Sequence, residues 1–476
     1  MPVDKTRLAR MLNPKTVVVV GDKGPEFRWL SNCSEFSGNL YSVQLDEKEI
    51  PGIEAKGVKN FRSLMEIPGE VDLVICAVPR NIAPFIVADA VKKQVGGMAM
   101  YTSGFVETTE PIGIELQGKI VAMANEGGMP LVGPNCMGVY NRRLGVKFMQ
   151  GQEKGEGGAI SIISQSGTHG IGMTMGAQRL GVPVTRTISI GNAAVLNEAD
   201  YLEYLLDDPE TPAIAMDLEG IRAGRRFFEL LREGTKKKPV IIWRGGRTRA
   251  GARAVKSHTA SLASDDAVWM ALMRQCGAIS TESLEDTIET IAALVHTPKS
   301  SKKNMALVAM TGGQSVAITD QFERAGFEVP ELSDSSYQRL GEFFVTIGGS
   351  YRNPFDASST IGRESDNLQK ILEILADDPA IEGVAIELQT RDFEKSTERL
   401  DGMLALMKQY REKTGQPVVG LIPTGGGMGD QEEIGSKARV HVANAGFPVY
   451  PSFRSGANAL GRVRAYYEEL EARTGK

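Results

Sequence analysis

A histidine in a long loop of small residues is the most reactive group that the sequence offers. His258 lies near the middle of segment 245–263, which is rich in Gly, Ala, Ser and Thr. Its imidazole is the only side chain there that can act as a nitrogen nucleophile near neutral pH. Small residues also let a loop move without losing much packing. The segment therefore predicts that His258 becomes phosphorylated and carries a phosphoryl group between two sites.

A turn rich in serine and glycine could hold that group. It follows the apolar run 159–163, which predicts a buried strand, and it opens a segment with a helical pattern to about residue 180. Such a turn offers free N–H groups and the positive end of a helix dipole, which bind anions. We expect an anion site at Ser164, Gln165, Ser166 and Gly167. For His169, just inside the helix, a structural role is expected, with a second phosphate contact as the alternative.

A carboxylate follows another apolar run, at Glu219. A carboxylate at a strand end can accept the N–H of one imidazole nitrogen, which leaves the other nitrogen free to attack phosphorus. We predict that Glu219 orients His258. On the residues alone, a surface glutamate that caps the next helix is an equal alternative.

Short apolar runs alternate with helical patterns along the whole chain, for example at 16–21, 72–78, 98–102, 185–190, 240–243, 305–310, 383–388 and 417–422. This alternation predicts an α/β protein with doubly wound parallel sheets, in which ligands bind at the carboxyl ends of the strands. A linker rich in glycine and charge at 151–158 and a basic linker at 298–304 suggest three domains. Their expected bounds are 1–150, 151–298 and 299–476.

The overall composition excludes several classes of protein. The net charge of −5 over 476 residues gives no reason to expect nucleic acid or an anionic membrane as a partner. The 4 cysteines are far apart and form no CxxC pair, so neither a disulfide framework nor a metal site is expected. No apolar run is long enough to span a bilayer, and the amino terminus lacks a signal core. We expect a soluble protein of the cytoplasm.

Small residues also collect at the predicted strand ends of the first third. They let a nucleotide approach the backbone, although for any one of them alone an ordinary βα turn is the better explanation. The candidates are Gly21, Lys23, Val78, Pro79, Ser103 and Gly104. The first of these turns lacks the G-x-G-x-x-G pattern, so an oxidoreductase that uses a nicotinamide cofactor is disfavoured.

Two motifs carry a family resemblance. Gly133-Pro134-Asn135-Cys136-Met137-Gly138 and the loop Ser257-His258-Thr259-Ala260-Ser261-Leu262-Ala263 resemble elements of the succinyl-CoA synthetase superfamily of NDP-forming acyl-CoA synthetases. Similar elements are Leu218-Glu219-Gly220 and Asn353-Pro354-Phe355-Asp356, the latter without an assigned chemistry. The resemblance implies a Rossmann-like CoA-binding domain followed by two flavodoxin-like domains.

The resemblance also implies roles for individual residues. Asn135 and Cys136 would line the place where the CoA thiol meets the acyl group, together with the strand-end residues of the first domain. The turn at 164–167 would hold the phosphate of the phosphohistidine, and Glu219 would act with His258. In this family an acid, CoA and ATP are converted to acyl-CoA, ADP and phosphate through an acyl phosphate.

The nucleotide-binding part of such an enzyme is not in this sequence. No Walker A pattern occurs, and the three expected domains leave no room for an ATP-grasp domain. We therefore expect an alpha-type subunit that works with an ATP-grasp beta-type subunit in a heterotetramer, with ATP, ADP and Mg²⁺ held mainly by the partner. Its other substrate would be a small carboxylic acid. Ala260 and Ser264 replace glycines of the family loop, and they support one alternative, a CoA or acyl-CoA binding protein without catalysis.

Overall fold

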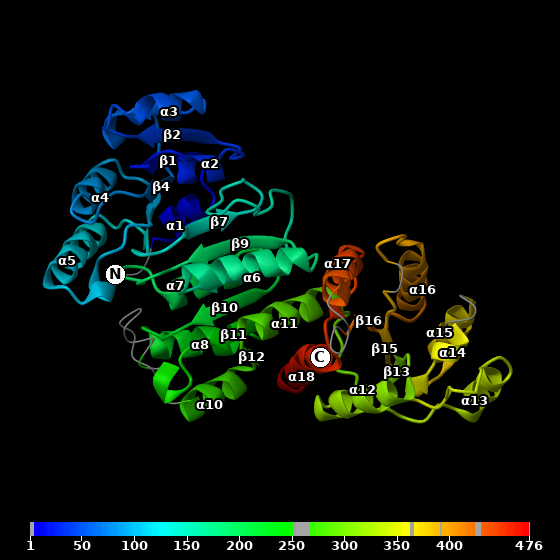
Figure 1. The fold of residues 1–476 in the computed structure, drawn as a ribbon. Helices are drawn as coiled ribbons and strands as arrows, with labels where there is room; N and C mark the ends of the chain where they lie inside the picture. Colours follow the sequence, from blue (N-terminus) through cyan, green and yellow to red (C-terminus); the bar gives the residue numbers. More distant parts are fainter. Residues whose placement is uncertain are drawn as a thin grey trace. The chain divides into compact units, whose positions relative to one another are not determined.

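The structure, a computed structural model, describes residues 4–251, 253, 266–361, 366–390, 393–423 and 430–475. Its strands form three sheets dominated by parallel pairs (Figure 1), which confirms the predicted α/β class. The chain divides into two compact units. The first unit runs from the amino terminus to Gln178 and from Pro183 to Thr287, and the second holds residues 179–182 and 288–476. The three-domain division at 150 and 298 remains a prediction.

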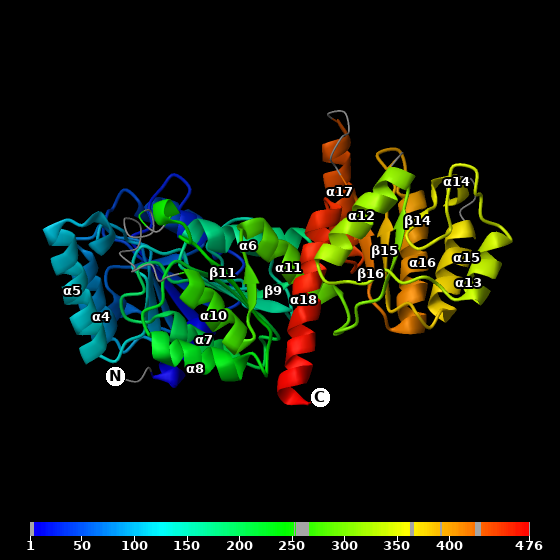
Figure 2. The same ribbon diagram turned by 90° about the horizontal axis from the view of Figure 1, so that it is seen from below.

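The first sheet has the order β3-β2-β1-β4-β5-β6, and all its pairs are parallel. This is the strand order of dinucleotide-binding folds, whose ligand crevice opens beside the first strand. The five residues of β1 are all buried, and α4 and α5 lie side by side in both views (Figures 1 and 2). The strands are β1 (Thr16–Val20), β2 (Asn39–Val43), β3 (Lys59–Phe61), β4 (Leu73–Cys76), β5 (Gly97–Met100) and β6 (Leu131–Val132). The helices are α1 (Lys5–Leu12), α2 (Arg28–Asn32), α3 (Ile50–Ala55), α4 (Ala83–Lys92) and α5 (Pro111–Glu126), with short 3₁₀ turns at Leu64–Glu66 and Val106–Thr108.

The second sheet has the order β12-β11-β10-β8-β9-β7. Its five parallel strands follow the flavodoxin-like order, with a switch point between β8 and β10. β7 pairs antiparallel with β9, so a segment of the expected first domain completes the second sheet. The strands are β7 (Gly138–Asn141), β8 (Ile160–Ser164), β9 (Val184–Ser189), β10 (Ile214–Leu218), β11 (Val240–Arg244) and β12 (Ile279–Thr281). The helices are α6 (Gly167–Arg179), α7 (Glu198–Asp207), α8 (Gly224–Gly234), α10 (Asp266–Cys276) and α11 (Leu284–His296).

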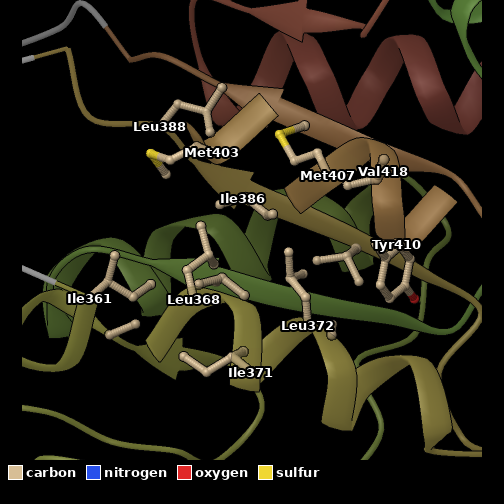
Figure 3. Close-up of a cluster of buried hydrophobic side chains, with 14 of the residues drawn as sticks. Ile361, Leu368, Ile371, Leu372, Ile386, Leu388, Met403, Met407, Tyr410 and Val418 are labelled. Carbon is tan, nitrogen blue, oxygen red and sulfur yellow. The ribbon is translucent and has the colours of Figure 1, made fainter. Parts of the chain in front are cut away.

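The third sheet has the flavodoxin-like order β14-β13-β15-β16-β17 and is also parallel. Apolar side chains of α15 and α16 meet those of β15 and β16 in a buried cluster (Figure 3). The strands are β13 (Met305–Ala309), β14 (Phe355–Asp356), β15 (Gly383–Glu387), β16 (Val418–Leu421) and β17 (Val449–Tyr450). The helices are α12 (Gly312–Arg324), α13 (Asp334–Gly341), α14 (Ser358–Ile361), α15 (Asp366–Asp377), α16 (Glu398–Thr414), α17 (Asp430–Asn444) and α18 (Phe453–Thr474).

Candidate active site

One pocket in the first unit brings together residues that were predicted separately. It has a volume of about 350 Å³. Its lining consists of Arg28, Tyr101, Ser103, Asn135, Cys136, Met137, Gln165, Ser166, Gly167, Thr168, Ile171 and Gly191. Three members of the predicted CoA set (Ser103, Asn135 and Cys136) thus share a wall with three members of the predicted anion set (165–167). Even the nearest members of the two sets are nearly 30 residues apart in the sequence, so the fold brings them together.

The remaining predicted CoA residues lie beside the switch point of the first sheet. Gly21 follows β1 with φ +84°, and a Cβ on it would lie 2.6 Å from Cγ1 of Val78. Only glycine fits there, because both the backbone conformation and the space exclude a side chain. Lys23 and Pro79, close to Gly21 and Val78 in the sequence, are exposed. The carbonyl of Gly104 accepts a 2.8 Å hydrogen bond from Arg80. These residues form the strand-end edge but do not line the pocket.

Asn135 and Cys136 form a tight turn in the pocket wall. Asn135 has φ +57°, and its backbone N–H donates to the carbonyl of Thr102 at 2.9 Å. The Cys136 thiol is 3.4 Å from the carbonyl of Met100. Burial raises the pKa of Cys136 to about 12, so the group stays a neutral thiol at neutral pH. Its contribution is to the shape of the wall, not to nucleophilic chemistry.

A buried amide beside Asn135 was missed by the sequence reasoning. Asn192 is fully buried, and its side-chain nitrogen donates to Glu107 at 2.6 Å and to Gln117 at 3.1 Å. Its side-chain oxygen lies 3.4 Å from the side-chain nitrogen of Asn135. The signal was present, because Gly191-Asn192 directly follows a predicted strand. Asn192 holds the amide of Asn135 in the pocket wall.

The predicted anion turn opens α6 as expected. Ser164, at the end of β8, donates its hydroxyl to the carbonyl of Ser166 at 2.7 Å. The α6 helix then begins at Gly167, where a Cβ would lie 2.8 Å from Cγ of Met137. The N–H of Gly170 donates to the carbonyl of Ser166 and that of His169 to its hydroxyl, which leaves the first two amides, those of Gly167 and Thr168, for an anion at this end of the pocket.

Gln165 ties this turn to Glu219 across the switch point of the second sheet. Its side-chain oxygen accepts from the N–H groups of Glu219 and of Gly220, the latter at 3.0 Å. Its side-chain nitrogen donates to the carbonyl of Gly220 at 3.0 Å. Gln165 is 3% exposed and Glu219 is 7% exposed. The carboxylate predicted to orient the histidine therefore follows a backbone segment that is fixed to the anion turn.

The loop that carries His258 leaves the sheet beside Glu219. The N–H of Gly245 donates to the carbonyl of Leu218 at 3.0 Å, and a Cβ on Gly245 would lie 3.7 Å from Cγ of Glu219. Arg247 pairs with Asp266, the first residue of α10, at 2.9 Å. His258 itself, with Ala260 and Ser264, lies outside the described residues. The contact predicted between His258 and Glu219 remains a prediction.

Comparison with known proteins decides the family. Residues 157–294 match the model of the succinyl-CoA ligase like flavodoxin domain, and residues 15–142 match the CoA binding domain. The chain is 30% identical over 447 residues to the acetate–CoA ligase [ADP-forming] II subunit alpha of Pyrococcus furiosus, covering 92% of this chain and 93% of that protein. The chain belongs to the ADP-forming acyl-CoA ligase family. It is therefore a ligase with a CoA-binding domain.

Two further relatives match over shorter lengths, and a solved structure shows the same fold. The acetate–CoA ligase [ADP-forming] I subunit alpha of P. furiosus is 32% identical over 360 residues, covering 73% of this chain and 76% of that protein. The acetate–CoA ligase [ADP-forming] I of Archaeoglobus fulgidus is 30% identical over 406 residues, covering 84% of this chain and 58% of that longer protein. A solved acetyl-coenzyme A synthetase 1 of Ca. Korarchaeum cryptofilum superposes with a TM-score of 0.80 at 24% identity, covering 98% of both chains.

In this chain, the element Asn353-Pro354-Phe355-Asp356 has a structural role. The Asn353 side chain accepts from the N–H of Leu307 at 3.0 Å and donates to the carbonyls of Met305 at 3.0 Å and Pro330 at 2.8 Å. These bonds attach the turn before β14 to the backbone of β13, and they use both the oxygen and the nitrogen of the amide.

Among the helices within the described ranges, none is long and apolar enough to cross a membrane.

Proposed function

We propose that this chain is the CoA-binding, histidine-bearing subunit of an NDP-forming acyl-CoA synthetase. In the synthetic direction, the γ-phosphoryl group of ATP passes to a nitrogen of His258, and ADP leaves from an ATP-grasp subunit that also holds Mg²⁺. A carboxylate oxygen of the acid then attacks the phosphorus, the N–P bond breaks, and an acyl phosphate forms. The CoA sulfur attacks the acyl carbon, and inorganic phosphate leaves with the thiol proton.

The shared pocket is the observation that carries this proposal. The last step needs the phosphate and the thiol within bond-forming distance of one acyl carbon. Asn135 and Cys136, assigned to the thiol, line the same cavity as Gln165, Ser166 and Gly167, assigned to the phosphate. The phosphates of CoA are at the opposite end of the molecule from its thiol, so an anion site beside the residues assigned to the thiol is suited to a second, transferred phosphate.

The relatives support the class of substrate and the need for a partner. Three of them are named acetate–CoA ligases, so we assign a small carboxylic acid to this chain. Two are named as alpha subunits, and the longer A. fulgidus ligase, of which this chain covers 58%, extends beyond the matched part. Both facts support a complementary subunit that binds the nucleotide.

The test is phosphorylation of the full chain. With an ATP-grasp subunit, Mg²⁺ and γ-labelled ATP, the label should appear on His258 as an acid-labile, base-stable phosphate that mass spectrometry can locate. His258→Ala should lose both the label and acyl-CoA formation. If that variant forms thioester at the wild-type rate, the mechanism is wrong. Tight CoA binding without any label would support the non-catalytic alternative.

A further inference from the structure

A histidine–aspartate pair stands at the amino end of α6. Nδ1 of His169 lies 3.2 Å from Oδ2 of Asp217, and Asp217 is fully buried near the end of β10. Oδ2 of Asp217 also lies 2.8 Å from the hydroxyl of Ser164, whose one proton is shared between Asp217 and the carbonyl of Ser166. Because a carboxylate only accepts, Nδ1 carries the proton in this pair. Nε2 of the imidazole, whose side chain is 36% exposed, is then the nitrogen that can meet a ligand.

The pair lies where the elements of the site converge. His169 is the third residue of α6, and its backbone N–H donates to the hydroxyl of Ser166 at 3.3 Å. Asp217 is two residues before Glu219. The imidazole ring packs against Trp243 with centroids 4.5 Å apart, and Trp243 belongs to the strand from which the His258 loop leaves. The imidazole thus lies beside the anion turn, the end of the strand that precedes Glu219 and the base of that loop.

The charges around His169 favour its protonated form. The hydrogen bond to Asp217 raises the pKa of His169 above its usual value, the charges of Asp217, Glu219 and Glu285 add to this, and partial burial opposes it. Among the described residues, no group donates to Oδ1 of Asp217, which is buried. A buried carboxylate with an incomplete set of donors strengthens the case for a cation beside it.

Two of the arginines near this edge lie beside Asp266. Arg244 lies 3.9 Å and Arg247 lies 2.9 Å from the carboxylate of Asp266. Arg28 lines the same pocket as the anion turn, and the charges that act on the His169 ring itself are those of Asp217, Glu219 and Glu285.

We propose that His169, held by Asp217, is the cation that binds the phosphoryl group at the amino end of α6. This inference rests on the proposed function, since it adds a residue to the same phosphate site. Nε2–H donates to a phosphate oxygen, and Asp217 is a positioning residue that fixes the ring and favours its protonated form. A phosphoryl group carries nearly two negative charges at pH 7, whereas a helix end supplies only about half a positive charge. The imidazolium offsets that difference and the nearby carboxylates.

The inference predicts a pH dependence with a definite sign. Phosphate binding gains from His169 only while the ring is protonated, so this gain is present at low pH and is lost as pH rises through the raised pKa of His169. Phosphate titrates in the same range, but its own titration is common to all variants. The difference between wild type and variant isolates the contribution of His169.

The test measures the Kd of inorganic phosphate for the full chain between pH 6 and pH 9 by calorimetry. His169→Gln should weaken binding about tenfold at pH 6.5, the lower end of the range for one charge-assisted hydrogen bond because the ring is partly exposed. It should also remove the part of the pH profile that belongs to the ring. Asp217→Asn should still bind phosphate at pH 6, but its binding should weaken at a lower pH than that of the wild type as the pH rises. A merely structural role of Asp217 would not produce this shift.

His441 provides a matched control. It pairs with Asp401 at 2.6 Å in the second unit, so His441→Gln removes a comparable histidine–aspartate pair and should leave phosphate binding unchanged. Melting curves show whether each variant is folded. Wild-type Kd and pH profile in His169→Gln or in a folded Asp217→Asn, or no phosphate binding by the wild type, overturns the inference. Labelling of His258 is scored separately, so the two proposals can fail independently.

Discussion

The side chain of Gln165 is expected to be the main link between the anion turn and the strand end that carries Glu219. Replacing it with leucine keeps most of the volume and removes all three hydrogen bonds. The N–H of Glu219, the N–H of Gly220 and the carbonyl of Gly220 then lose their partner. Gln165, Glu219 and Gly220 are all buried, so water cannot easily replace it.

The size of the effect follows from these three groups. Each buried backbone group left without a partner costs about 1–3 kcal/mol. The three groups together predict a loss of about 3–9 kcal/mol from the local stability of the second sheet. The backbone at Glu219 should loosen at the same time, and phosphorylation of His258 should slow.

The first sheet offers a matched control in Gln44. Its side chain also accepts from two consecutive N–H groups, those of Leu45 at 2.8 Å and Asp46 at 3.0 Å, and donates to the carbonyl of Asp22 at 2.9 Å. Leu45 is 68% exposed, so water can replace part of what Gln44→Leu removes. We expect a smaller cost, about 1–2 kcal/mol, confined to the first sheet.

Hydrogen exchange followed by mass spectrometry distinguishes the two variants. Peptides that contain β8 and β10 should exchange faster in Gln165→Leu and at the wild-type rate in Gln44→Leu. Labelling by ATP in the presence of the partner should drop only in the first variant. Unchanged protection of β8 and β10 in Gln165→Leu would show that the glutamine does not join the turn to the strand, and the reasoning would be refuted.

Three further outcomes are expected. Gly21→Ala should cost about 2–4 kcal/mol and weaken CoA binding, because it adds a clash with Val78 to a left-handed backbone. Gly57→Ala is the control, because Gly57 has φ +75° and no atom lies within 4 Å of the added Cβ. Its denaturant melt should show only the cost of the left-handed backbone, about 1–2 kcal/mol. Equal losses of stability in the two variants would contradict the clash with Val78. Glu219→Gln should slow histidine phosphorylation at least about a hundredfold with an unchanged melt, and rapid labelling would remove Glu219 from the mechanism. Burial raises the pKa of Cys136 from 9.0 to about 12, so between these values the thiol ionises in the unfolded chain but not in the folded one. The stability that the buried neutral thiol contributes is therefore complete below pH 9 and is lost between pH 9 and 12. Cys136→Ala should flatten this decline of stability with pH, and an unchanged slope would refute the prediction.

Local patterns were sufficient to predict the class of fold and most of the central strands. β1, β4, β5 and β13 are continuous apolar runs buried along their whole length, and such runs stand out in a sequence. Edge strands did not stand out. β3 (Lys59–Phe61) is exposed or half-buried, so it carries no hydrophobic signal. β7 lies in the expected first domain but pairs with β9, a partner that only the tertiary fold selects.

The site was predictable in its parts but not in its arrangement. Gly21, Asn135 and the turn at 164–167 are unusual locally, because they need a left-handed backbone or open a helix. The contacts of Asn192 and the position of Tyr101 in the pocket wall depend on packing between elements that are far apart in the sequence. No local pattern predicts that residues 101 and 165 line the same pocket. His258 was indicated by its loop alone, and its contact with Glu219 stays a prediction.

Strand order explains why the decisive contacts escape a reading of the sequence. β8 and β10 are neighbours although β9 lies between them in the chain, and their register pairs Ser164 with Asp217. That pairing places the Asp217 carboxylate beside the Ser164 hydroxyl and within reach of His169 on α6. A slip of one residue would turn Asp217 to the opposite face of the sheet. The histidine–aspartate pair is therefore a product of register, and its chemistry requires the sheet to be fully formed.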